Sequence, residues 1–145
     1  MKLTNVFISI TMVVGIAFSS LTLSSCNGKN EIASYFNNAA KTTKEETPLP
    51  QQTDETTTWV DVKYYEKENV YEYVYEINVP FTEKHPSSQV QEMKNAMLPI
   101  MVEAIKMEGD FYDKVKQYKT TLRFVYISND GKEFCNFKIL PSELD

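Results

Sequence analysis

The sequence predicts an α+β fold, a two-layer sandwich in which an antiparallel four-stranded sheet carries one kinked or broken helical segment on one face. Two observations lead to this prediction. Apolar and polar residues alternate in two runs before position 80 and in two more after position 119, as they do in strands with one buried face. Between these pairs of runs, apolar residues recur at helical spacing. The predicted order is therefore β-β-α-β-β.

The first two predicted strands, residues 59–66 and 70–79, are rich in aromatic residues and are joined by a turn at 68–69. In the second strand one face is apolar and the other is mixed. The apolar face consists of Tyr71, Tyr73, Tyr75, Ile77 and Val79. Pro80 ends this strand because it has no N–H group to donate to a neighbouring strand.

The helical segment follows. Ser88 and Gln91 have the spacing of a capping box, which predicts a helix start near Ser88. Pro99 lies inside the apolar pattern and predicts a kink, and Gly109 predicts the end of the helix. A shorter amphipathic piece then carries Phe111 on its apolar side. The apolar residues at helical spacing in the first part are Val90, Met93, Met97, Ile100, Met101, Ala104 and Ile105.

The last two predicted strands, residues 120–127 and 133–140, form a hairpin. Residues 128–131 read Ser-Asn-Asp-Gly, and Asn, Asp and Gly tolerate the positive φ angles of tight hairpin turns. Pro141 stops the second strand.

Residues 1–25 have the pattern of a signal peptide. Lys2 supplies a short positive region, and residues 6–23 are mainly apolar. A permanent transmembrane helix is the alternative, but serines interrupt the end of the apolar run and no basic stop-transfer group follows it. We therefore expect this leader to be cleaved.

The leader ends in Leu23-Ser24-Ser25-Cys26, which resembles a bacterial lipobox. The resemblance implies a lipoprotein: cleavage before Cys26, a diacylglycerol thioether on its sulfur and acylation of the new amine, with chains such as palmitate. Two or more acyl chains anchor a protein stably in a membrane. Asn27 follows the cysteine instead of Asp, and the resemblance then favours the outer membrane in an organism that has one.

The predicted domain division places a lipidated flexible tether at residues 26–58 and a small α+β domain at 59–145. The tether is polar and carries Pro48 and Pro50, so it cannot bury enough apolar surface to offset the entropy of ordering. A weak apolar patch at 32–36 could form a helical turn at the membrane surface, and a flexible stalk is the favoured interpretation. The Tyr-rich second strand, Met-rich helix and closing Asn-Asp-Gly hairpin of the domain also resemble small domains of uncharacterised bacterial lipoproteins.

Composition excludes several function classes. The net charge of −5 and the single arginine, Arg123, argue against nucleic-acid binding, which needs clustered basic residues. With Cys26 lipidated, Cys135 has no partner for an internal disulfide, and two cysteines with one histidine, His85, are too few for a zinc site. We expect no metal and no cofactor.

The candidate catalytic groups are weak. Cys135 lies in a predicted strand among apolar residues, and a catalytic thiol would need His85 nearby, so a buried inert thiol is favoured. Glu72, Glu76 and Asp61 could form an acidic strip, but calcium needs six to eight oxygen ligands, so a solvated face is favoured. We expect no catalytic residues and no enzymatic activity.

The aromatic residues leave two possibilities open. Tyr71, Tyr73 and Tyr75 either pack in the sheet by cross-strand aromatic pairs or form a partly exposed binding surface. The methionines at 93, 97, 101 and 107 likewise either fill the core or form an adaptable surface.

These observations predict a non-enzymatic lipoprotein of the bacterial cell envelope that is held in the membrane by acyl chains on Cys26. Its domain would bind a protein or another envelope component. The alternative function is a surface module that binds a small molecule or glycan through the strip at Tyr71, Tyr73 and Tyr75.

Overall fold

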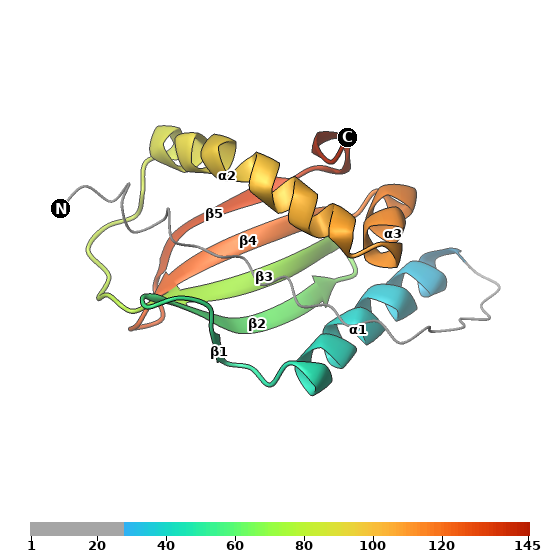
Figure 1. The fold of residues 1–145 in the computed structure, drawn as a ribbon, viewed down its shortest axis with the longest axis horizontal. Helices are drawn as coiled ribbons and strands as arrows, with labels where there is room; N and C mark the ends of the chain where they lie inside the picture. The colour runs from blue at the N-terminus through green and yellow to red at the C-terminus, as the bar shows by residue number, and fades with distance from the viewer. Residues whose placement is uncertain (1–27) are drawn as a thin grey trace.

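The computed structural model describes residues 28–145, so the predicted leader and Cys26 lie outside the described residues. The described chain forms one sheet with helices beside it (Figure 1). In chain order the elements are α1 (Gly28–Glu46), β1 (Gln51–Gln52), β2 (Thr57–Tyr65), β3 (Val70–Ile77), α2 (Ser87–Met107), α3 (Asp110–Tyr118), β4 (Thr121–Ser128), β5 (Glu133–Ile139) and the short 3₁₀ helix η2 (Pro141–Glu143).

The sheet has five strands in the order β1-β2-β3-β4-β5. The predicted α+β class and the β-β-α-β-β order of the four long strands are confirmed, but the prediction of a four-stranded antiparallel sheet is wrong in two respects. The two-residue strand β1 adds a fifth strand at the edge, antiparallel to β2. The central pair, β3 and β4, is parallel. The reason is that α2 and α3 carry the chain back to the end of the sheet where β3 began, so that β4 runs beside it in the same direction.

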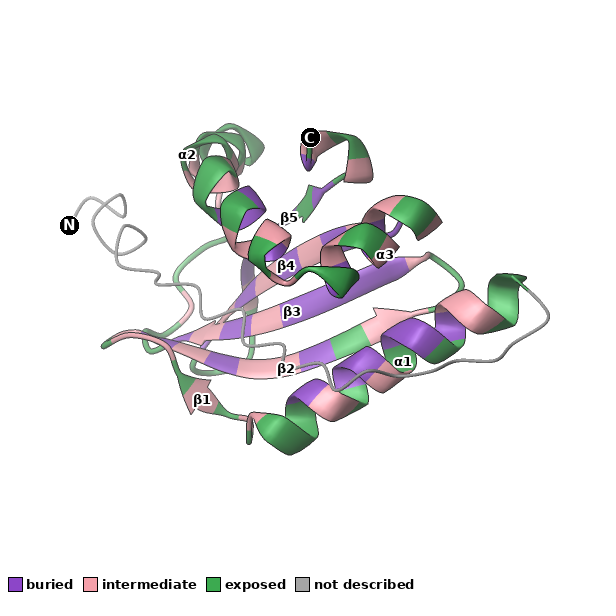
Figure 2. Ribbon diagram, turned by 45° about the vertical axis from the view of Figure 1, so that its right-hand side comes forward, coloured by how far each residue is buried: buried purple, intermediate pink, exposed green. Residues whose placement is uncertain are grey.

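All three helices cover one face of the sheet (Figures 1 and 2). The ring of Phe36, on α1, contacts those of Tyr71, on β3, and Phe111, on α3. The buried core lies between the helices and this face. The strands send alternate residues into it, which include Tyr73 and Phe124, whose rings stack with their centroids 5.0 Å apart.

The structure differs from the flexible tether that the sequence predicts over 26–58. In the described part, residues 28–46 form α1, whose Phe36 is 0% exposed, and residues 51–52 pair with β2. The cause is the spacing of a few apolar residues. Most of the buried side chains recur every three or four positions and therefore share one side of the helix. The buried residues of α1 are Ala33, Tyr35, Phe36, Ala39, Ala40 and Thr43.

Most of the predicted turns and helix ends are present. The β2–β3 turn has a positive φ of 52° at Asn69, and the β4–β5 hairpin turn has one of 81° at Gly131. Gly109, with φ of 52°, separates α2 from α3. Figure 1 shows α2 changing direction near its middle, in the part of the helix that contains Pro99. The predicted capping box does not form, because the N-cap of α2 is Pro86, two residues before Ser88, and the helix start has no side-chain cap.

The second face of the sheet is not covered by a helix. Here the strands present mixed side chains, and several charged ones pair with each other. Arg123 on β4 contacts Glu72 on β3 and also Glu68 in the β2–β3 turn. At one end, the loop after β3 partly covers this face, where Phe81 and His85 stack on Phe134.

Candidate functional site

The three tyrosines proposed as a binding surface are buried. Tyr71, Tyr73 and Tyr75 are each at most 1% exposed, because strand alternation points them at the face that the helices cover. The ring of Tyr75 stacks on that of Tyr126 with centroids 5.5 Å apart, and the ring of Tyr71 meets that of Phe111 at 5.1 Å. Burial also raises the pKa of each of the three hydroxyl groups. Cross-strand packing, the other possibility that the sequence left open, is what these residues do.

Of the two cysteines, only Cys135 lies in the described part of the chain. Cys26, the predicted lipidation site, lies outside the described residues. Cys135 is a free, buried cysteine on β5, and burial raises the pKa of its thiol to about 12. Its neighbour in sequence, Phe134, points to the opposite face of the sheet, and the ring of His85 stacks there at 5.5 Å. The thiol and the imidazole therefore belong to opposite faces, and the thiol is protonated at neutral pH.

Of the three acids that could form an acidic strip, Asp61 and Glu72 are paired with cations, and Glu72 is buried (8% exposed), unlike the solvated face that the sequence favours. Asp61 accepts ion pairs from Lys44 at 2.8 Å and from Lys63 at 2.9 Å. Glu72 binds Arg123 and also accepts a hydrogen bond from the hydroxyl of Tyr65 at 3.1 Å. Within residues 28–145, no group of three or more His, Cys, Asp or Glu side chains is arranged to hold a metal ion.

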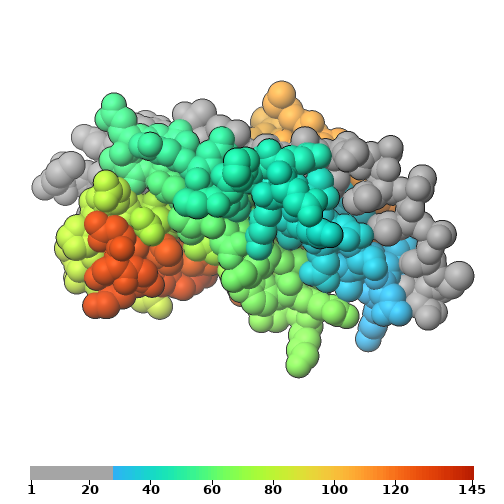
Figure 3. Space-filling model, turned by 90° about the horizontal axis from the view of Figure 1, so that it is seen from below, coloured from blue at the N-terminus to red at the C-terminus, as the bar shows by residue number. Residues whose placement is uncertain are grey.

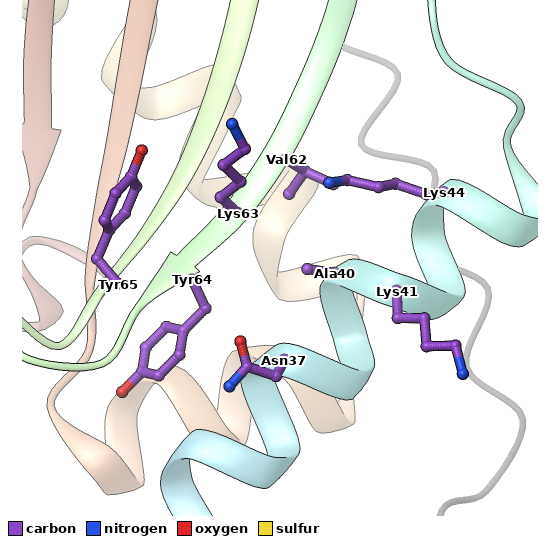
Figure 4. Close-up of a pocket in the computed structure, with 8 residues that line it drawn as sticks. All are labelled: Asn37, Ala40, Lys41, Lys44, Val62, Lys63, Tyr64 and Tyr65. Carbon is purple, nitrogen blue, oxygen red and sulfur yellow. The ribbon is translucent and has the colours of Figure 1, made fainter.

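A shallow hollow of about 350 Å³ lies where α1 meets β2 (Figure 4). Its lining includes Lys41, Lys44, Lys63 and Tyr65, which suggests an anion site at first sight. However, Lys44 and Lys63 already pair with Asp61, and Lys41 lies 3.8 Å from Glu45. Figure 4 shows the Lys63 and Lys41 side chains directed away from each other, so the lysines do not converge on one ligand. This hollow supports no site.

A different surface stands out on α2. Four large apolar side chains of the described chain are exposed, and two of them are on this helix: Ile100 is 67% exposed and Met107 is 88% exposed. They continue a series in which successive members are four, three, four and three residues apart, the spacing that places side chains in one line along a helix. We call this series the α2 stripe: Met93, Met97, Ile100, Ala104 and Met107.

The α2 stripe is distinct from the side of the helix that faces the sheet. Met101, Val102 and Ile105 are the buried residues of α2, and at 3.6 residues per turn they lie about 120° around the helix axis from the stripe. Met93, Met97 and Ala104 are half-buried against the core, which fixes the position of the stripe. The helix thus has one apolar face that is buried by the fold and a second on which Ile100 and Met107 are exposed. Figure 2 shows that α2 is exposed along much of its length.

Acidic residues border the stripe on the side away from the sheet. By helical geometry Glu92 and Glu103 lie on the same flank, and both are exposed. Glu103 is 3.2 Å from Lys106, one turn along the helix. The surface is therefore an apolar line with an acidic edge.

The sequence contains this signal, but the predicted apolar series combines it with the core pattern. The series includes Ile100, which is 67% exposed, and Met101, which is 1% exposed. The seven apolar residues of the series cover an arc wider than the core contacts, so the sequence alone does not say which of them are exposed.

The structure resembles solved structures of bacterial proteins. A Pseudomonas aeruginosa protein classed as secreted aligns with 83% of this chain and 100% of its own, at 8% identity and a TM-score of 0.60. The pilotin EpsS of the type 2 secretion system of Vibrio vulnificus aligns with 81% of this chain and 94% of its own, at 11% identity and a TM-score of 0.55. AspS, the type II secretion system pilotin of Vibrio cholerae, aligns with 79% and 94% at 12% identity and a TM-score of 0.50.

At these identities the likeness shows a shared fold. No protein-family model matches the sequence, and a search of curated proteins finds no match. Among residues 28–145, no helix is both long enough and apolar enough to span a membrane.

Proposed function

We propose that this protein is a non-enzymatic lipoprotein of the bacterial envelope that binds a helical segment of a protein partner along the α2 stripe. The observation that carries the proposal is the exposure of Ile100 and Met107, two large apolar side chains on one line of α2 that the core leaves in solvent. The lipobox-like end of the leader supports the anchor at Cys26. The fold shared with secretion-system pilotins supports a role in the envelope.

The geometry of the α2 stripe defines the partner. From Met93 to Met107 it spans about 21 Å at 1.5 Å per residue, which matches about four turns of a second helix. A partner helix with apolar residues every three or four positions can pack against it. Methionine side chains adapt to different shapes, and they supply three of the five contacts. Glu92, which is exposed, favours lysine or arginine on the facing edge of the partner.

Hydrophobic burial gives the interaction its strength. Covering an exposed Ile or Met side chain contributes about 1.5–3 kcal/mol each. Ile100 and Met107 therefore contribute most of the binding free energy. The half-buried members of the stripe mainly determine how well the partner helix fits the surface.

The alternative of a small-molecule or glycan site loses its support, because that hypothesis depends on Tyr71, Tyr73 and Tyr75, and these are buried. We retain no second function.

The test is a photo-crosslinking experiment on the acylated protein in its own envelope, with a crosslinker at Ala96, beside the stripe. We expect a discrete crosslinked partner. The substitutions Ile100→Glu and Met107→Glu should each reduce the yield at least tenfold, because a charge in an apolar contact costs more than 1.4 kcal/mol. Leu140→Glu is the matched control, since Leu140 is also an exposed apolar residue (47%) but lies outside the stripe.

Two results would contradict the proposal. Equal crosslinking in the Ile100→Glu and Leu140→Glu variants would show that the stripe is not the contact. The anchor is tested in parallel with Cys26→Ala, which should abolish labelling by a fatty-acid probe and release the protein from the membrane fraction. Persistent labelling would show that the anchor is elsewhere.

A further inference from the structure

Helix α1 is fixed to the rest of the domain. Its Phe36 is fully buried, and the ring is 5.1 Å from that of Tyr64 and 5.9 Å from that of Phe111. Near its C-terminal end, Lys44 pairs with Asp61 on β2. The helix is therefore part of the folded unit along most of its length.

The first turns of α1 are also fixed, by hydrogen bonds to α3. The hydroxyl of Tyr118 donates to Glu31 at 2.8 Å, and the hydroxyl of Tyr35 donates to Asp110 at 2.8 Å. The β2–β3 turn joins the same group, because the side-chain amide of Asn69 donates to the carbonyl of Tyr118 at 3.0 Å. The start of α1, the C-terminal end of α3 and the β2–β3 turn thus form one end of the molecule.

We call this the α1 end. Figure 3 shows the start of α1, in light blue, and the β2–β3 region, in green, together on one side, with the β4–β5 hairpin, in red, at the other extremity. Figure 1 shows the same arrangement, with α3 also at the α1 end. The hairpin lies beyond the opposite end of the 8-residue strand β4, about 26 Å along the sheet from the α1 end.

The predicted acylation site is close to this end in sequence. Cys26 precedes Gly28 by two residues, and two extended residues span at most about 7 Å. A lipid on Cys26 would therefore hold the first turn of α1 at the bilayer surface.

The α1 end carries both signs of charge. Within the described chain, five lysines have no ion pair with a carboxylate, and four of them lie at or beside this end: Lys29, Lys67, Lys114 and Lys119. Acidic residues of the same elements offset them. Glu31 and Asp110 accept hydrogen bonds from tyrosine hydroxyls, which leave the negative charge in place, and Glu66 and Asp113 are exposed. The contact of this end with the bilayer therefore depends on the short connection to Cys26 and not on an excess of positive charge.

We infer that the α1 end is a membrane-contact surface that fixes the orientation of the domain on the bilayer, with the β4–β5 hairpin pointing away. This inference rests on the lipidation of Cys26 in the proposed function. In this arrangement α1 connects the anchor rigidly to the domain. The α2 stripe then lies at a fixed distance from the bilayer and at a fixed angle to it. The occupant of this surface is the lipid layer that holds the anchor.

The experiment uses the full acylated chain in vesicles that contain phosphatidylglycerol with nitroxide-labelled headgroups. A fluorophore is attached at Gln117→Cys, at the α1 end, or at Asn129→Cys, in the hairpin turn; both residues are exposed and uncharged. Cys135 does not compete for the label, because it is buried and its thiol pKa is about 12. We expect several-fold stronger quenching at position 117 than at 129.

Lengthening the connection should remove the difference. An insertion of about 20 Gly and Ser residues between Asn27 and Gly28 has a root-mean-square span of about 25 Å, close to the length of the sheet. Position 117 should then be quenched much less in this variant, while the fold is untouched.

Equal quenching at 117 and 129 in the unmodified chain would overturn the inference. Failure of the proposed anchor has a separate signature, because a chain without a lipid on Cys26 would not bind the vesicles and neither label would be quenched.

Discussion

Helices α1 and α2 lie on the same face of the sheet but use their side chains in opposite ways. The 19-residue helix α1 is polar in composition, yet six of its residues are buried. The 21-residue helix α2 is much more apolar, yet three are buried, and Ile100 and Met107 extend into solvent. Apolar content therefore does not measure how firmly a helix belongs to the core. What α1 buries is required by the fold, and what α2 exposes is available to a partner.

The largest effect expected from this difference is at Phe36. Replacing it with Ala removes a fully buried ring from the junction of α1, β2, β3 and α3, and should lower the free energy of unfolding by about 3–5 kcal/mol. Urea unfolding measures the loss. Asn37→Ala, the next residue on the same helix but exposed, should stay within about 0.5 kcal/mol of the parent protein. A similarly small loss for Phe36→Ala would mean that α1 is not part of the core.

A second pair of substitutions compares the two sides of α2. Ile105 is 0% exposed, and Ile105→Ala should cost about 2–5 kcal/mol. The same chemical change at Ile100 should cost no more than about 0.5 kcal/mol, because its side chain is already in water. Thermal unfolding of the two variants gives the comparison directly. If Ile100→Ala is as destabilising as Ile105→Ala, Ile100 belongs to the core and the α2 stripe has no free face.

The smallest expected effect is a loss of folding stability at low pH. Burial alone would raise the pKa of Asp61, but the hydrogen bonds from Lys44, on α1, and Lys63 outweigh it and hold that pKa below its ordinary value of 3.8. Because the folded-state pKa is lowered, the pair stabilises the protein above about pH 4 and loses this contribution as the pH falls through the folded-state value. The pair is partly exposed, so the contribution is below about 1 kcal/mol.

The measurement is the stability difference between the parent protein and Asp61→Asn at pH 7 and at pH 3. This difference should shrink in acid. A difference that is constant with pH would show that the ionised form of Asp61 does not help to hold α1.

The local features of this fold were predictable because each depends on a few neighbouring residues. The alternation in β3 and the Asn-Asp-Gly hairpin turn are determined by residues that are adjacent in the sequence. The docking of α1 was not predictable in this way, since the value of Phe36 depends on Tyr64, Tyr71 and Phe111, which are distant in sequence. The parallel pairing of β3 with β4 is likewise a long-range choice that strand patterns do not encode.

The candidate site also has one part that the sequence predicts and one that depends on tertiary packing. The spacing of the α2 stripe can be read from the sequence, but its exposure depends on how α2 sits over β5 and α3. The tyrosines of β3 present the reverse case, because their alternation is local and the helices that cover them come from elsewhere in the chain. Which apolar face is free is therefore a property of the assembled layers.

The hydrogen bond between Tyr118 and Glu31 joins residues 87 positions apart. Since the chain is made from its N-terminus, α1 is complete long before α3, which supplies Phe111 and Tyr118 to cover it. A polar helix of this length is marginal in water by itself. Contacts of such long range also form slowly. The segment beside the predicted anchor is thus the first part of the described domain to be synthesised, and its full set of contacts with α3 can form only after residue 118 has been made.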